Sequence, residues 1–205
     1  MKTLAKLVLG ITLLALMAAA PTPAAAQPAA AIVVTQTLHD GVLDFQYPRV
    51  VGLPDAAAQD TINAAIGRRV AEFRHLDAEV AMARYEVRHN GDGLLSLTMT
   101  FYLYSGGAHG MTYMRGLTFD LATGREYRLT DLVPYAGGGR AKIDAAIAAQ
   151  LKKRDIPLLQ TFDGIGENPD FYLAADGRPV VFFQLYELAA YVYGILEFPL
   201  PFNGR

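Results

Sequence analysis

A strictly alternating segment, Leu95–Tyr104, constrains the fold of this chain more than any other feature. Apolar residues at every second position are separated by hydroxyl-bearing ones: Leu95, Leu97, Met99, Phe101 and Leu103 against Ser96, Thr98, Thr100, Tyr102 and Tyr104. Successive side chains of a strand point to opposite faces, so this period predicts a strand with one face in a core. A hairpin turn, Asn90–Gly93, precedes it, and a second alternating segment, Tyr113–Leu121, follows it. Together these segments predict an antiparallel β-meander.

Helical spacing occurs in two other segments. One starts near Asp55 and the other ends at Lys152–Arg154; their apolar stripes are Ile62, Ile66, Val70 and Phe73, and Ile143, Ile147 and Leu151. Further strands are predicted at Ile32–Val34, at Val42–Tyr47 (ended by Pro48) and at Pro179–Phe183, whose continuous apolar run is typical of a buried central strand. We therefore expect an α+β fold, with antiparallel β-meander sheet(s) packed against two main helices.

The first 26 residues have the pattern of a secretory signal peptide. Lys2 and Lys6 precede an apolar run over 7–20, and small residues at 24–26 supply a cleavage site after Ala26. We expect residues 27–31 to form a disordered leader and the mature protein to be periplasmic or secreted. No second long apolar segment follows, so we expect no membrane association after signal cleavage. The chain has no cysteine, and its stability must come from packing rather than from disulfides.

Charge excludes one class of partner. The 18 Lys and Arg residues are outnumbered by 20 Asp and Glu residues, and the excess of acid grows when Lys2 and Lys6 are removed with the signal. This balance gives no reason to expect nucleic-acid binding, and it weakly favours a basic partner.

The loop Ser105–Gly110 contains the histidine of most interest. Three glycines surround His109 and give its backbone unusual freedom. An imidazole titrates near neutral pH, so His109 is a candidate for hydrogen bonding to a ligand or for acid–base chemistry. The alternative is a structural role, in which its ring nitrogens fix the loop. No catalytic set and no metal-binding spacing accompany it, so we assign no catalytic residue and expect no metal or cofactor.

A second cluster, Tyr186–Gly194, is rich in tyrosine. Tyr186 and Tyr191 offer apolar area with a polar tip, which suits a binding surface and suits the edge of a core equally well. Glu187 is a possible general base, although a single carboxylate without a partner is poor support for that role. We take His109, Tyr186, Glu187 and Tyr191 as tentative binding residues.

The order of these motifs resembles the DUF3298 family, preceded by a DUF4163 (PdaC-type) region. The residues that carry the resemblance are Gly106–Gly110, Phe119-Asp120-Leu121, Thr123-Gly124, Leu129-x-Asp131-Leu132, Phe171-Tyr172-Leu173, Asp176-Gly177, Tyr186–Gly194 and Glu197-Phe198. It implies a DUF4163-like region over 32–104 and a DUF3298-like region over 105–205, forming one compact unit. The family often has a proline where this chain has Ala190.

What the resemblance implies about function is a binding role. Related modules occur as the extracytoplasmic part of RsiV-type anti-sigma factors that bind lysozyme, as N-terminal modules of peptidoglycan deacetylases, and as stand-alone exported proteins. We therefore expect an exported cell-envelope binding module whose partner is a lysozyme-like protein or peptidoglycan. The alternatives are a hydrolase that uses His109 with Glu187 or an aspartate, and a structural envelope protein without a small ligand.

Overall fold

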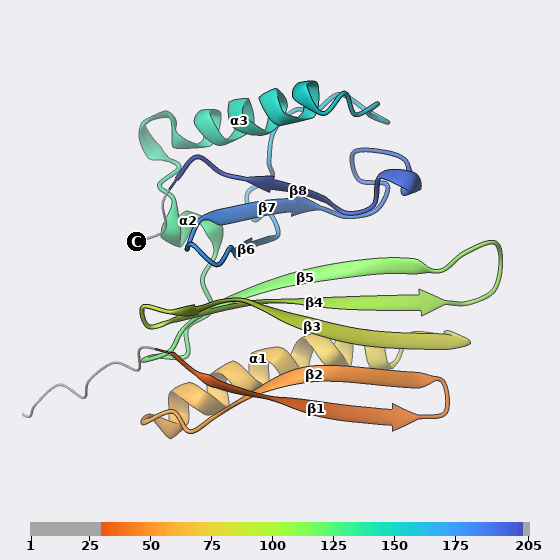
Figure 1. Cartoon of the computed structure of the whole chain (residues 1–205), viewed down its shortest axis with the longest axis vertical. Coiled ribbons are helices and arrows are strands. Elements are labelled where there is room, and N and C mark those ends of the chain that lie inside the picture. The colour runs from red at the N-terminus through yellow and green to blue at the C-terminus, as the bar shows by residue number, and fades with distance from the viewer. Residues whose placement is uncertain (1–29, 203–205) are drawn as a thin grey trace, which may run out of the picture.

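The computed structural model describes residues 30–202. The predicted signal peptide and residues 27–29 of the predicted leader lie outside these described residues. Among residues 30–202, no helix is both long and apolar enough to cross a membrane. The described chain forms two lobes, each a sheet with one main helix, so the expected α+β fold with two main helices is confirmed (Figure 1).

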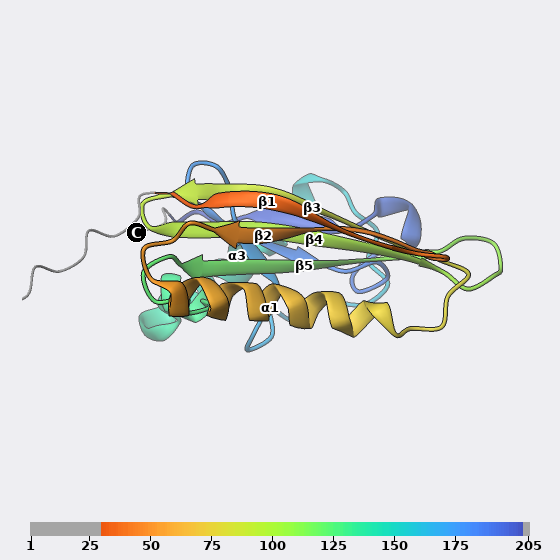
Figure 2. The same cartoon turned by 90° about the horizontal axis from the view of Figure 1, so that it is seen from below.

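Lobe 1 contains the N-terminal sheet and helix α1, Ala56–Arg74. Its five strands lie in the order β1-β2-β3-β4-β5, with the bounds Ile32–Asp40, Leu43–Val51, Val80–Gly91, Leu94–Tyr104 and Met111–Asp120. The predicted meander is confirmed for β3, β4 and β5. One pairing departs from it, because β2 runs parallel to β3, with Leu43–Phe45 beside Ala81–Ala83. Helix α1 connects these two strands and lies along one face of the sheet (Figure 2).

Helix α1 forms where the sequence predicts it. Asp55 caps its N-terminus, and the carboxylate accepts the backbone N–H groups of Ala57 and Ala58 at 2.8 and 3.1 Å. The predicted stripe is buried, and it packs against the apolar face of β4 in one core; the members from both elements are Ile62, Ile66, Val70, Phe73, Leu95, Leu97, Met99 and Phe101. Burial of this shared face is what holds the helix on the sheet.

Lobe 2 contains three strands in the order β6-β7-β8, with the bounds Phe171–Leu173, Pro179–Phe183 and Leu196–Pro199. The expectation of a buried central strand is confirmed, since every residue of β7 is buried. Helix α3, Gly139–Lys153, covers the face of this sheet that is turned away from lobe 1. Short elements complete the lobe: α2 (Leu129–Leu132), η1 (Ala136–Gly138) and η2 (Tyr191–Tyr193).

The two lobes meet where β6 crosses the open face of the first sheet. Gly116 of β5 leaves room for the backbone of Phe171, since a Cβ there would collide with the Phe171 carbonyl group. Ser96 of β4 is fully buried and accepts the backbone N–H of Leu173 at 2.8 Å. Arg88 of β3 lies over the Tyr172 ring, 4.7 Å from its centroid. The seam between the lobes therefore combines close backbone packing with buried polar contacts.

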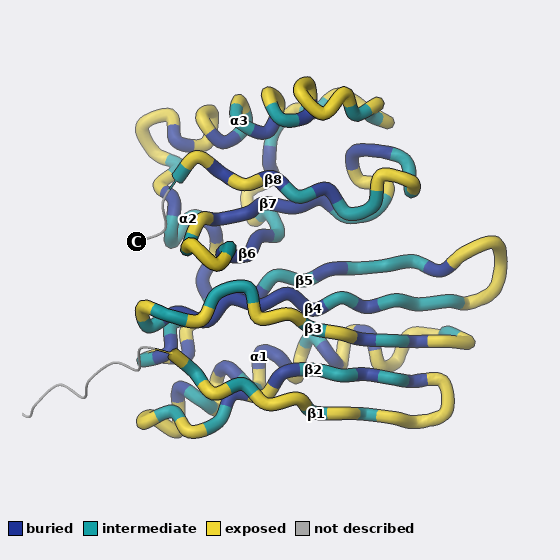
Figure 3. Tube along the Cα trace, viewed as in Figure 1, coloured by how far each residue is buried: buried dark blue, intermediate teal, exposed yellow. Residues whose placement is uncertain are grey.

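One end of the molecule, which we call the loop end, collects connecting segments from both lobes. The turn between β1 and β2, the β4–β5 loop and the η2 region all lie there, and they are largely exposed (Figure 3). The described chain begins and ends near the opposite end (Figure 1). Because β5 belongs to the first sheet, the two lobes divide after Asp120. The boundary at 104/105 between the two family-like regions stays a prediction.

Candidate functional site

The two motif segments predicted from the sequence meet at the loop end. The ring of His109 stacks on the ring of Tyr191, with centroids 4.1 Å apart and planes inclined by 25°. The Tyr191 hydroxyl donates to the carbonyl of Gly110 at 3.3 Å. Tyr186 adds a third ring, 5.8 Å from that of Tyr191. The Ser105–Gly110 loop and the Tyr186–Gly194 segment thus form one surface from two lobes.

The glycine loop places His109 through its backbone geometry. Gly106 and Gly107 have φ values of 89° and 95°, which side-chain-bearing residues rarely adopt. The Tyr104 hydroxyl donates to the Gly107 carbonyl at 3.0 Å, and the His109 Nδ1 donates to the Gly110 carbonyl at the same distance. A carbonyl only accepts, so the proton of a neutral His109 resides on Nδ1 and Nε2 is left as an acceptor.

The tyrosine segment begins with a strained turn. The backbone N–H of Glu187 donates to the Gln184 carbonyl at 3.1 Å, which closes a turn whose third residue is Tyr186 with φ 65°. Glycine or asparagine is usual at such a position. The Glu187 carboxylate closes the turn from the other side by accepting the Gln184 N–H at 2.7 Å. Strain of this kind gathers at functional sites, and here it directs a tyrosine outward.

The residues around this turn are strongly exposed for their type. Tyr186 is 46% exposed, Val192 is 82% exposed and Tyr193 is 40% exposed. We call the surface formed by His109, Tyr186, Tyr191, Val192 and Tyr193 the aromatic tip. Ala190, just before η2, has φ −62° and ψ 156°, the backbone conformation that a proline would also have.

We predict that Tyr186→Asn leaves the free energy of unfolding unchanged or raises it by up to about 1 kcal/mol, because asparagine tolerates the left-handed backbone that strains a tyrosine. Urea denaturation of the two proteins measures the difference. Tyr193→Asn, which replaces an exposed tyrosine in η2 without a positive φ, is the matched control and should bring no gain. A loss greater than about 1 kcal/mol in Tyr186→Asn would show instead that Tyr186 is held mainly for packing.

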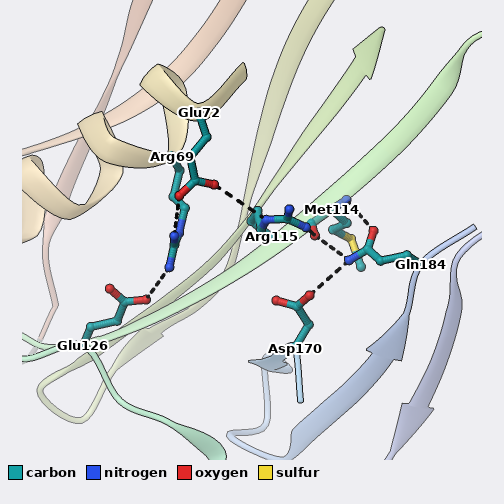
Figure 4. Close-up of polar contacts among 7 residues, drawn as sticks. All are labelled: Arg69, Glu72, Met114, Arg115, Glu126, Asp170 and Gln184. Carbon is teal, nitrogen blue, oxygen red and sulfur yellow. Dashed lines mark hydrogen bonds and ion pairs between the residues drawn. The ribbon is translucent and has the colours of Figure 1, made fainter. Parts of the chain in front are cut away.

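Gln184 anchors the tip to lobe 1. Its carboxamide accepts the Met114 N–H at 3.0 Å and donates to the Met114 carbonyl at 2.8 Å, in the manner of a neighbouring strand on the β5 edge (Figure 4). The same Nε2 donates to the Asp170 carboxylate at 3.1 Å. Gln184 therefore joins β5, the residue before β6 and the turn that carries Tyr186.

A chain of charged groups extends from this anchor toward α1 (Figure 4). Arg115 lies 3.9 Å from the Glu72 carboxylate and donates to the Met114 carbonyl, while Arg69 bridges Glu72 and Glu126 (Figure 4). Burial raises the pKa of Asp170, although the charge of Arg115 and the bond from Gln184 act in the opposite direction. Burial also raises the pKa of Glu187, and the charge of Asp170 adds to the effect while the Gln184 N–H opposes it.

A hollow of about 330 Å³ lies beside the aromatic tip, between the end of α1 and the glycine loop. Its wall is mixed, with aliphatic, aromatic and polar groups contributed by Leu76, Asp77, Ser105, His109, Met111 and Tyr113. The Ser105 hydroxyl donates to the Asp77 carbonyl at 2.7 Å, which ties the loop to the chain after α1.

The structure brings together three of the four predicted binding residues. His109, Tyr186 and Tyr191 form the tip, whereas the Glu187 carboxylate turns back to the Gln184 N–H. Among residues 30–202, the His109 ring forms a hydrogen bond with the Gly110 carbonyl and none with a carboxylate. The His109–carboxylate pair that a hydrolase would use is therefore not assembled in the described part of the chain. Within residues 30–202 no group of three His, Asp or Glu side chains is placed to hold a metal ion.

Sequence reasoning missed the residues that fix the tip in place. Gln184 is the first polar residue after the buried strand β7, and Asp170 directly precedes β6; these positions are the only signal that the sequence offers. A polar residue at the end of a buried strand is common, so that signal does not distinguish an anchor from an ordinary strand end.

Two family models match this chain. Residues 131–203 match the model described as a protein of unknown function, DUF3298, and residues 35–112 match the model described as deacetylase PdaC. No curated protein matches the chain.

Two solved structures share the fold. A DUF3298 family protein from Pseudomonas aeruginosa PAO1 has a TM-score of 0.58 and 18% identity, covering 85% of this chain and 90% of that chain. A DUF3298 family member from Bacteroides fragilis NCTC 9343 has a TM-score of 0.56 and 18% identity, covering 86% and 90%. At this identity the likeness concerns the fold.

Proposed function

We propose that this chain, which carries a DUF3298 region preceded by a PdaC-type region, is an exported binding module of the cell envelope that holds its ligand at the aromatic tip. The signal-like N-terminus supports export to the periplasm or beyond. The observation that carries the proposal is the convergence of the two motif segments in an exposed, strained surface built from both lobes.

A lysozyme-like protein is the first candidate ligand. Val192 and the two neighbouring tyrosines project from the loop end, and an exposed aromatic and aliphatic cluster is typical of a protein-binding hot spot. Asp77 and Glu79 lie on the adjoining rim, next to the glycine loop, and form no ion pair within residues 30–202. Their charge favours a partner with a basic surface.

Cell-wall glycan is the second candidate, and the hollow beside His109 supports it. Its mixed wall offers a tyrosine ring for the apolar face of a sugar, together with Asp77, Ser105 and His109 for hydroxyl groups. The hollow and the tip share His109, so a glycan chain bound there would also contact the tip.

We predict that the protein binds lysozyme or purified peptidoglycan at physiological salt, and that Tyr186→Asn combined with Val192→Ser weakens that binding about tenfold or more, as expected for removal of central hot-spot side chains. Calorimetry with lysozyme and co-sedimentation with peptidoglycan measure the two affinities. A tip-dependent loss for one ligand alone identifies it.

The matched control is Val87→Ser, which removes an exposed valine of β3 outside the tip and should leave both affinities unchanged. Absence of binding to both ligands would overturn both named candidates. Equal loss in the control and in the tip variant would show that the tip is not the site.

A further inference from the structure

We propose that Gln184, Asp170 and Glu187 form a pH-sensitive latch that positions the tyrosine turn against β5, holding it more firmly as the medium becomes acidic. The inference rests on the proposed function only in naming the turn as part of a binding surface. The latch itself is a property of the free protein, and it is tested without a ligand.

The geometry gives Gln184 contacts to three separate segments. Its carboxamide makes two hydrogen bonds with Met114 on the β5 edge and one with Asp170, while its backbone N–H donates to Glu187. The last contact closes the turn around the strained Tyr186. Release of Gln184 from Met114 and Asp170 would therefore free the turn from lobe 1, while the contact of Tyr191 with Gly110 would remain.

Two carboxylates accept hydrogen bonds from Gln184, one from its side chain and one from its backbone N–H, and their titration makes the latch sensitive to pH. Asp170 faces Arg115 on β5 and, farther away, Arg69 and Glu72 on α1. Glu187 faces the Gln184 N–H and Asp170. Burial outweighs the favourable contacts at both carboxyls; the charge of Glu72 adds to the effect at Asp170 and the charge of Asp170 adds to it at Glu187. The pKa of each carboxyl is therefore raised above its ordinary value, 3.8 for Asp and 4.5 for Glu.

The direction of the pH effect follows from these raised pKa values. Released carboxyls in water would return to their ordinary pKa, so the latched arrangement binds protons more readily than the released one. Lowering the pH from neutrality toward 3.8–4.5 therefore shifts the equilibrium to the latched arrangement. Above both raised pKa values the two groups are charged in either arrangement and this contribution is absent.

The experiment is amide hydrogen exchange of the peptide covering 184–194, with protection expressed relative to the intrinsic exchange rate at each pH. In the unmodified protein we expect protection to rise as the pH is lowered from neutrality toward 3.8–4.5, by up to tenfold for each unit by which a pKa is raised. Peptides from β3 and β4 report global stability in the same samples, and a change confined to 184–194 separates latch opening from unfolding.

Two substitutions change the titration in opposite ways. Asp170→Asn keeps an acceptor for Gln184 and removes one of the two titrating groups, so protection of 184–194 should be higher near neutral pH and should vary less with pH than in the unmodified protein; the remaining variation comes from Glu187. Gln184→Glu places a new carboxylate against Asp170 and the Met114 carbonyl, so protection should be lost near neutral pH and recovered in acid, when the new carboxyl is protonated and donates in place of the amide. A purely structural glutamine would not produce this recovery.

Matched controls make the same changes of charge elsewhere. Asp163→Asn alters an exposed aspartate of lobe 2, and Gln46→Glu alters a glutamine of β2; both should leave the pH profile of 184–194 unchanged. Protection that does not vary with pH in the unmodified protein, or an Asp170→Asn profile equal to the unmodified one, would overturn the latch. Neither result bears on ligand binding, which the tip variants test separately.

Discussion

Substitution of Gly116 by alanine is expected to destabilise the protein by at least about 3 kcal/mol, at the upper end of the range for overpacked cores. Gly116 lies in β5 directly beneath β6, and an added Cβ would collide with the carbonyl group of Phe171 and also crowd the Phe182 ring. A backbone carbonyl cannot rotate away as a flexible side chain can. The two sheets would have to separate locally, which removes contacts across the seam.

Gly67→Ala is the matched control for this prediction. Gly67 lies in the interior of α1, is exposed, and has open space where a Cβ would be added. Alanine there should stabilise the protein by about 0.5–1 kcal/mol, because glycine is a poor helix former. Urea denaturation of both variants should therefore give effects of opposite sign. A Gly116→Ala protein as stable as the original would mean that β6 does not pack this closely on β5.

Local pattern was sufficient to predict the elements that form each core. The alternating apolar residues of β4 and the apolar stripe of α1 each predict one buried face, and in the structure these two faces pack against each other. Asp55 was recognisable as the start of α1 because a carboxylate cap depends on nearby backbone alone. These features require no knowledge of distant parts of the chain.

Pairing between distant strands could not be predicted in the same way. The sequence predicts that β2 ends before Pro48, and this is wrong, because β2 continues to Val51. Strand β2 pairs with β3 only over Leu43–Phe45. Pro48 has no backbone N–H to donate, but it also has no partner on β3 that would need one, so the strand can continue through it. Farther along, the Asn63 carboxamide takes the place of a strand by bonding both backbone groups of Val50 at 2.9 and 2.8 Å.

The candidate site shows the same division between local and distant information. His109 and Tyr191 could be identified from the sequence because one lies in a glycine-rich loop and the other in a tyrosine-rich segment. The stacking of the two rings could not be predicted, because it depends on how the two lobes pack together. Gln184 has no local signature, since its importance comes from reaching Met114, 70 positions away. The tip was visible in the sequence, whereas its anchor became visible only in the structure.

Substitution of Ser96 by alanine is the second change for which we expect a large effect, a loss of about 2–4 kcal/mol in the free energy of unfolding. The Ser96 Oγ accepts the Leu173 N–H at 2.8 Å and also shares a hydrogen bond of 2.8 Å with the Thr118 hydroxyl. All three residues are buried to within 1% exposure. Alanine would leave the Leu173 N–H without its partner in a site closed to water, and the unmet donor is what makes the change costly.

The exposed Ser105 provides the matched control. Its hydroxyl also donates a single hydrogen bond, to the Asp77 carbonyl at 2.7 Å, but water can replace that bond, so Ser105→Ala should cost no more than about 0.5 kcal/mol. Adding Thr118→Val to Ser96→Ala should cost less than the sum of the two single changes, because the pair shares one bond. If Ser96→Ala were as mild as Ser105→Ala, the buried polar contact would not be holding β6 to β4. Hydrogen exchange at the Leu173 amide locates the loss, since the seam would open there before either core unfolds.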